Sequence, residues 1–305
     1  MKKIQSLIKL VLPGFLVAAT GVGAGDLLTA SLAGKHLGLV VLFVPVIGAL
    51  FKYVLTFGIA KYQIATGKSL LSGWFKSFPR FFQYIFFFYL FIWTFMVSGA
   101  ILNGAGASMA AIFNLPGDTK IYFGVAQTIL SFALIKKGSF KLFETIMSIL
   151  VAMMFFIFIF MALGMIDLNS QIESNVSLAL LSDPWLIGVL GGVGGTLTIL
   201  SYGYWIKESN REGEKGLNLT RIDLCVSYTL TAIFSMAMIF LGAKLTGFDG
   251  GKKEIISALS NMILFEYGSA GAFFFKIGFW AGIFSSLLGV WQSVGYNLNS
   301  LILSF

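Results

Sequence analysis

The chain has 305 residues, of which 57% are hydrophobic and only 11% are charged, and it carries a formal net charge of +8. Soluble globular domains contain about 25% charged residues, so this composition excludes a soluble domain and indicates an all-α, polytopic membrane protein. The lysines and arginines lie in short loops between apolar runs, which is typical of membrane topology and argues against a nucleic-acid partner. The single cysteine, Cys225, lies in an apolar run and excludes a disulfide framework.

A helix needs about 20 mostly apolar residues to cross a bilayer, and the runs between charged loops predict eight such helices. In chain order they cover 7–32, 37–60, 81–113, 121–135, 143–166, 185–206, 222–241 and a run that starts near position 270. The lysines at the N-terminus and the apolar run behind them look like a signal peptide. That apolar run is too long for one, so it is predicted to be the first membrane helix.

The distribution of lysine and arginine predicts the orientation of these helices. If the N-terminus is cytoplasmic, fourteen of these residues fall on the cytoplasmic side and five on the opposite side, with Lys52 and Lys276 inside helices and not counted. Cytoplasmic loops of membrane proteins carry an excess of such cations. We therefore expect a multi-pass protein of the inner (plasma) membrane with a cytoplasmic N-terminus, whose oligomeric state the sequence leaves open.

Two glycine clusters interrupt predicted membrane helices: GVGAG at 21–25 in the first helix and GGVGGT at 191–196 in the sixth. Glycine costs about 1 kcal/mol relative to alanine inside a helix, and unwound backbone is tolerated in a membrane only where protein or water satisfies it. Breaks at corresponding places in two halves of a chain indicate the central site of a transporter. Close helix packing at small residues is the alternative. A nucleotide-binding loop is excluded, because Asp26 stands where its fingerprint needs glycine.

Asp26 is a carboxylate inside a predicted membrane helix, which costs at least ~2.5–3.5 kcal/mol and predicts a functional role. We expect it to bind an ion or a proton. The alternative is a structural ion pair with Lys52, whose long side chain also allows it to reach the cytoplasmic surface.

The polar groups near the two breaks offer mainly oxygen atoms, which suit hard cations such as Mg, Ca and Mn. The predicted metal site uses the carboxylate of Asp26, the backbone carbonyls of Gly23 and Ala24, and carbonyl or hydroxyl oxygens of Thr196 and Thr198. Further polar positions that we assign to the ion pathway are Lys52, Ser201 and Gln292.

Over essentially its whole length the chain resembles the natural resistance-associated macrophage protein (Nramp) family of divalent metal transporters. Residues 13–17 (PGFLV) are similar to the start of the family's first helix, and the family's Asp-Pro-Gly-Asn motif falls on 23–26 (GAGD). The Met-Pro-His motif of its sixth helix falls on 198–200 (TIL), and 202–205 (YGYW) is similar to a divergent bacterial branch. Ser285 and Ser286 fit the small-residue and serine pattern of its eighth helix.

The chain departs from the family at several ligands. Gly23 stands where the family has its metal-binding Asp, and Asp26 stands where the family has Asn. The soft methionine ligand is absent, and residues 93–99 lack the acidic side chains that serve proton movement in the family. In these respects the donor set is similar to that of Nramp-related magnesium transporters.

The resemblance implies a transporter fold of two inverted repeats of five helices each, with discontinuous first and sixth helices. The repeats are expected at about 7–166 and, in part, 185–305, within one transmembrane domain that spans 1–305. The ninth and tenth helices of such a fold have no counterpart before Phe305, so we expect a C-terminally incomplete fold.

These features predict a membrane transporter of divalent metal cations of the Mn/Fe/Mg class that works by alternating access. The metal ion is its substrate, and no resident cofactor is expected. One alternative is a transporter of an amino acid or another small organic solute on the same fold, with the substrate carboxylate held at half-helix N-termini. Another is a non-transporting fragment. An enzyme is not expected, because the membrane helices contain no nucleophile–base pair.

Overall fold

The computed structural model describes residues 23–166, 183–193, 195–245 and 255–302, and within these ranges every regular element is helical. In chain order the elements are α2 (Ala24–Leu37), the 3-10 helix η1 (Gly38–Phe43), α3 (Val44–Thr66), α4 (Leu70–Ser77), α5 (Arg80–Ile112), η2 (Gly117–Thr119), α6 (Lys120–Lys137), α7 (Phe140–Gly164), α8 (Pro184–Gly192), η4 (Leu197–Ser201), α9 (Tyr202–Glu208), α10 (Gly213–Ala243) and α11 (Ile255–Ile302). The all-α expectation is thus confirmed for the described part of the chain.

Six stretches of the described residues are long and apolar enough to cross a membrane, against the eight helices predicted from the sequence. The first stretch, Gly25–Thr66, holds two predicted helices, because only the short η1 separates α2 from α3. The helix α6 is not among the six, because three of its 18 residues are lysines. Predicted helix residues 7–22 lie outside the described part.

The last predicted helix starts near position 270, and in the structure a helix begins there, directly after a kink. As a whole, α11 begins at Ile255 and bends at Gly268, whose φ of 70° lies in the left-handed region that favours glycine. The polar residues around this bend resemble a loop in the sequence. The bend is instead anchored in the protein, because the hydroxyl of Tyr267 donates a hydrogen bond to the carbonyl of Met161 in α7 at 2.9 Å.

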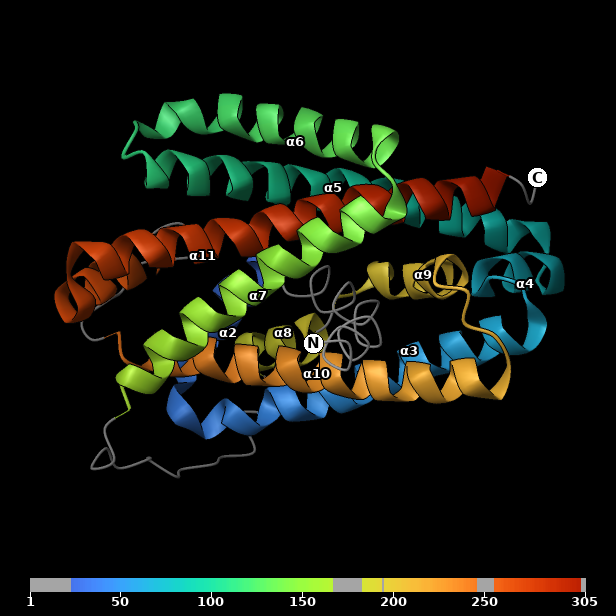
Figure 1. Ribbon diagram of the computed structural model, residues 1–305, viewed down its shortest axis with the longest axis horizontal. Coiled ribbons are helices and arrows are strands. Elements are labelled where there is room, and N and C mark those ends of the chain that lie inside the picture. Colours follow the sequence, from blue (N-terminus) through green and yellow to red (C-terminus); the bar gives the residue numbers. More distant parts are fainter. Residues whose placement is uncertain (1–22, 167–182, 194, 246–254, 303–305) are drawn as a thin grey trace, which may run out of the picture.

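Most of the long helices run along the longest axis of the molecule, and α7 crosses them obliquely (Figure 1). On one side α5 and α6 form an antiparallel pair, with α11 beside them; on the other side α10 packs against α2 and α3. The helix α11 also packs against α7 and is lined by buried residues along most of its length. In contrast, α5 exposes a row of large apolar side chains, as expected for a helix that faces lipid.

Glycines set the closest helix contacts. A Cβ atom added at Gly34 in α2 would lie 1.9 Å from the carbonyl oxygen of Ile239 in α10. One added at Gly242 in α10 would lie 1.9 Å from the carbonyl oxygen of Ser31 in α2. The two backbones therefore touch at this crossing, which is how small residues associate helices in membranes. This crossing fixes α2, and with it the start of that helix, relative to α10.

We expect Gly34→Leu and Gly242→Leu to destabilise the protein by at least ~1–3 kcal/mol, because each added side chain must displace a backbone carbonyl. The matched control is Gly99→Leu, since Gly99 is exposed on α5 and has no atom within 4 Å of an added Cβ. The melting temperature of detergent-purified protein, measured by fluorescence-detected size exclusion, tests this. Equal melting temperatures for Gly34→Leu and Gly99→Leu would contradict the packing argument.

Candidate functional site

The sixth predicted helix is broken in the structure. The helix α8 ends at Gly192, and the chain continues through non-helical residues into η4, which begins at Leu197, and then α9. Gly195 has a φ of +81°, a conformation that glycine adopts without steric cost, and Thr196 has φ −116° and ψ −101°. The break therefore lies within GGVGGT, as the sequence predicts, and it leaves backbone groups outside any helix.

Helix α2 begins in the middle of the first predicted run. Gly23 is extended, and the helix starts at Ala24. The carboxylate of Asp26 turns back and accepts a hydrogen bond from the backbone N–H of Gly23 at 3.2 Å, as the third residue of a capping box does. A carboxylate in the first turn also interacts favourably with the helix dipole. Asp26 therefore has a local structural role at the start of α2, whatever else it binds.

The start of α2 and the end of α8 face each other through glycines. A Cβ added at Gly192 would lie 2.4 Å from the second carboxylate oxygen of Asp26, Oδ1. A Cβ added at Gly23 would lie 2.7 Å from the hydroxyl oxygen of Ser286 in α11. The Asp26 carboxylate thus lies between the start of α2 and the end of α8, with α11 closing a third side. Close packing and a polar site are therefore both present here, and the two interpretations of the glycine clusters do not exclude each other.

Lys52 in α3 reaches the break that follows α8. Its ammonium donates a hydrogen bond to the backbone carbonyl of Gly195. Within the described residues it forms no direct ion pair with Asp26, although the two charges lie near enough to interact. The structure therefore orients Lys52 toward the break, rather than into a direct pair with Asp26 or out to the membrane surface.

Three of the remaining predicted residues lie between Thr196 and Ser201, and the fourth, Gln292, lies in α11. Thr196 is exposed and precedes η4, and Thr198 within η4 is buried. The hydroxyl of Ser201 pairs with that of Ser293 in α11 at 2.6 Å. The side-chain oxygen of Gln292 accepts a hydrogen bond from Trp205 Nε1 at 2.9 Å. Ser201 and Gln292 thus join η4 and α9 to α11.

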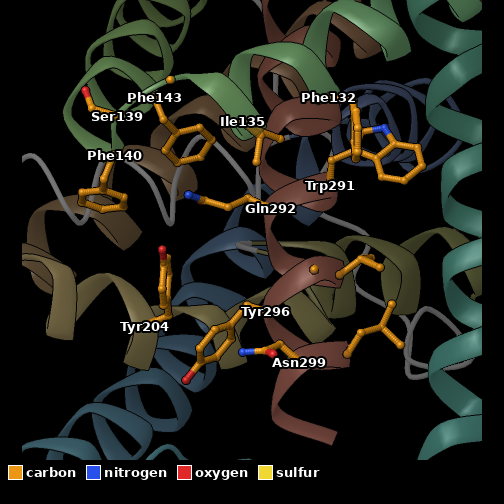
Figure 2. A pocket seen from close by; sticks show the side chains of 14 residues that line it. Phe132, Ile135, Ser139, Phe140, Phe143, Tyr204, Trp291, Gln292, Tyr296 and Asn299 are labelled. Carbon is orange, nitrogen blue, oxygen red and sulfur yellow. The ribbon is translucent and has the colours of Figure 1, made fainter. Parts of the chain in front are cut away.

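A cavity of about 520 Å³ opens between α6, α7, α9 and α11. Figure 2 shows the Gln292 side chain extending into it, with Phe143 and Ile135 on one side and Tyr204 and Tyr296 on the other. The rings of Tyr204 and Tyr296 lie 4.8 Å apart. A second cavity of about 470 Å³ shares three lining residues with the first: Tyr204, Tyr296 and Asn299. The two cavities are therefore separated only by this shared wall.

A buried ion pair near the far end of α9 was not expected from the sequence. Arg211 Nη1 lies 2.8 Å from Asp223 Oδ2 in α10, and both side chains are almost fully buried. The hydroxyl of Tyr202, the first residue of α9, donates to the same carboxylate oxygen at 2.9 Å. The sequence places Arg211 in a loop between predicted helices. Asp223 could have been identified from the sequence, because it is a carboxylate inside the predicted membrane helix 222–241.

The described residues contain no group of three or more His, Cys, Asp or Glu side chains that could hold a metal ion. A cation between the breaks would therefore meet one carboxylate together with backbone and hydroxyl oxygens. That arrangement suits a hard cation that passes through the site better than a closed structural metal centre.

Comparison with known proteins supports the resemblance. The family model described as natural resistance-associated macrophage protein-like (Nramp) matches residues 14–298. The divalent metal cation transporter MntH of Staphylococcus aureus (strain bovine RF122 / ET3-1) is 24% identical over 253 residues, which cover 79% of this chain and 56% of the relative. The chain thus spans little more than half the length of this curated relative. The family assignment confirms the predictions that the chain is an Nramp-type multi-pass membrane protein and is not an enzyme.

Solved structures show the same fold. Two mutants of the Eremococcus coleocola manganese transporter superpose with TM-scores of 0.74 and 0.73 at 16% sequence identity. In both comparisons 98% of this chain matches 70% of the transporter chain.

We expect Asp223→Asn to destabilise the protein by about 3–5 kcal/mol, because it removes the negative charge that lies 2.8 Å from the buried guanidinium of Arg211. The control is Glu214→Gln, in the exposed first turn of the same helix, which should change the stability by less than about 1 kcal/mol. Melting temperatures of the purified variants test this. If Asp223→Asn and Glu214→Gln have the same melting temperature, the ion pair of Arg211 with Asp223 does not hold α9 to α10.

Proposed function

The chain belongs to the natural resistance-associated macrophage protein-like (Nramp) family, and on this premise we propose that it moves a divalent metal cation across the membrane by alternating access. The observation that carries the proposal is that the start of α2 and the break after α8 meet at one carboxylate, Asp26, within the membrane-spanning part of the chain. Ions are bound in transporters where unwound backbone and half-helix ends face each other in this way.

The proposed site uses the Asp26 carboxylate as its one charged ligand. Backbone carbonyls of Gly23 and Ala24, at the start of α2, and oxygens of Thr196 and Thr198, beside the second break, complete it. Carboxylate, carbonyl and hydroxyl oxygens suit cations of the Mn/Fe/Mg class. The similar proteins are named as transporters of divalent metal cations and of manganese, which supports the same class of substrate.

The proposed pathway leads from the breaks along α9 to the two cavities lined by Tyr204 and Tyr296. The second cavity is also lined by Lys68, Lys76 and Lys207, which belong to the side that the lysine and arginine distribution predicts to be cytoplasmic. We therefore propose that these cavities open to the cytoplasm and that the N-terminus lies on the same side. The domain organisation proposed with this pathway is one transmembrane unit of two inverted repeats, at about 7–166 and 185–305.

Transport of an organic solute has less support. That alternative needs a free half-helix N-terminus to hold a substrate carboxylate. At the start of α2 the N–H of Gly23 already donates to Asp26, which supplies the negative charge that the helix end favours. Saturable Mn²⁺ uptake into proteoliposomes that is unaffected by amino acids would separate the metal from the organic substrate.

We expect Asp26→Asn to weaken Mn²⁺ binding by about tenfold or more and to abolish Mn²⁺ uptake, because the site loses its one charged ligand while the cap geometry is kept. The matched control is Asp118→Asn, in the exposed segment before α6, which should bind and transport like the wild type. Uptake into proteoliposomes and calorimetric titration of the purified protein measure both effects. Wild-type uptake by Asp26→Asn would contradict the proposed site.

The proposed orientation predicts the sidedness of thiol labelling. In a Cys225→Ser background, Asp118→Cys should react with a membrane-impermeant maleimide on intact cells, because α5 separates it from the predicted cytoplasmic side. Lys68→Cys, in the wall of the second cavity, should react only after the cells are opened. The reverse pattern would show that the N-terminus is not cytoplasmic.

A further inference from the structure

The position of Lys52 is determined by contacts on both sides of it along α3. One turn before it, an added Cβ at Gly48 would lie 2.9 Å from the carbonyl oxygen of Leu190 in α8, so the two helices are in close backbone contact there. One turn after it, the hydroxyl of buried Thr56 pairs with the hydroxyl of Tyr228 in α10 at 2.6 Å. Residues four apart share one face of a helix, so this face of α3 directs Lys52 at the break that follows α8.

At the break the Lys52 ammonium contacts a group that is suited to binding a cation. The carbonyl of Gly195 belongs to the unwound segment between α8 and η4, and the lysine donates its hydrogen bond to that carbonyl. The carboxylate of Asp26 lies against Gly192, three residues before Gly195 on the same side of the break. The lysine therefore brings a positive charge to the carbonyl side of the proposed site, while Asp26 brings the negative charge beside Gly192.

We propose that Lys52 is a tethered cation that occupies the carbonyl side of the substrate site and must withdraw before a divalent metal ion binds there. This inference rests on the proposed function, because it concerns the same site. A divalent cation beside an immobile ammonium would be repelled, and the repulsion between charges a few ångströms apart is strong where water is scarce. Withdrawal of Lys52 frees the Gly195 carbonyl for the incoming ion and leaves Asp26 to neutralise part of its charge. Lys52 thus lowers the affinity of the site for cations and determines which ions bind strongly enough to displace its ammonium.

Three variants separate the charge of Lys52 from its hydrogen bond. Lys52→Gln keeps a hydrogen-bond donor and removes the charge, and Lys52→Arg keeps the charge. Lys61→Gln removes an exposed lysine from the same helix and serves as the matched control. We expect Lys52→Gln to bind Mn²⁺ about tenfold or more tightly than the wild type in calorimetric titration. Lys52→Arg should show no such gain in affinity, and Lys61→Gln should bind like the wild type. Unchanged or weaker binding by Lys52→Gln would overturn the inference.

A second measurement uses the wild-type protein and does not depend on the folding of a variant. Saturating Mn²⁺ should increase the rate at which an amine reagent modifies Lys52, because the ammonium leaves the Gly195 carbonyl, and Lys61 should react at a constant rate. Peptide mass spectrometry measures both lysines in one sample. Saturable Mn²⁺ binding with an unchanged Lys52 rate would overturn the tethered-cation inference and leave the proposed function intact. Absence of Mn²⁺ binding in the wild type and in every Lys52 variant would overturn both.

Discussion

Backbone groups inside a membrane need a hydrogen-bond partner, and the start of α2 and the break after α8 leave such groups without a partner in their own helix. In this protein a charged side chain serves each break. Asp26 accepts from the N–H of Gly23 at the start of α2, and Lys52 donates to the carbonyl of Gly195 after α8. One of these side chains is acidic and accepts, and the other is basic and donates, so each end of the site is served by the kind of group that it needs. The remainder of the site depends on this arrangement.

Glycine has two separate roles at the breaks. Gly195 adopts a positive φ, so its role is conformational. Gly23 and Gly192 provide space, because a side chain on either would collide with Ser286 or with Asp26. The glycine clusters therefore serve both close packing and the site. Because α2 and α8 approach this closely, the carboxylate of Asp26 in α2 lies against the end of α8.

The helix α10 connects the parts of the protein that surround the site. It touches α2 backbone to backbone at Gly242, bonds to α3 through Tyr228, and holds α9 through Asp223. The first cavity lies between α9 and the helices α6, α7 and α11, and the second lies between α9, α11 and the α3–α4 region. A movement of α9 toward or away from α11 would change the cavities without breaking the contacts that α10 makes with α2 and α3. This division fits a fold in which one bundle moves against another.

Local properties of the sequence were enough to predict the membrane class, most helix positions and the break within GGVGGT, because length, hydropathy and glycine content act over short distances along the chain. The resemblance to the Nramp family followed from the same segments. The direction of Lys52, the contact of Gly23 with Ser286, the pairing of Arg211 with Asp223 and the helical segment of α11 before Gly268 could not be predicted in this way. Each of these depends on which helices cross and how closely. Those crossings are decided by pairs of small residues far apart in the sequence, such as Gly34 and Gly242, so only the tertiary structure determines which side chains meet at the site.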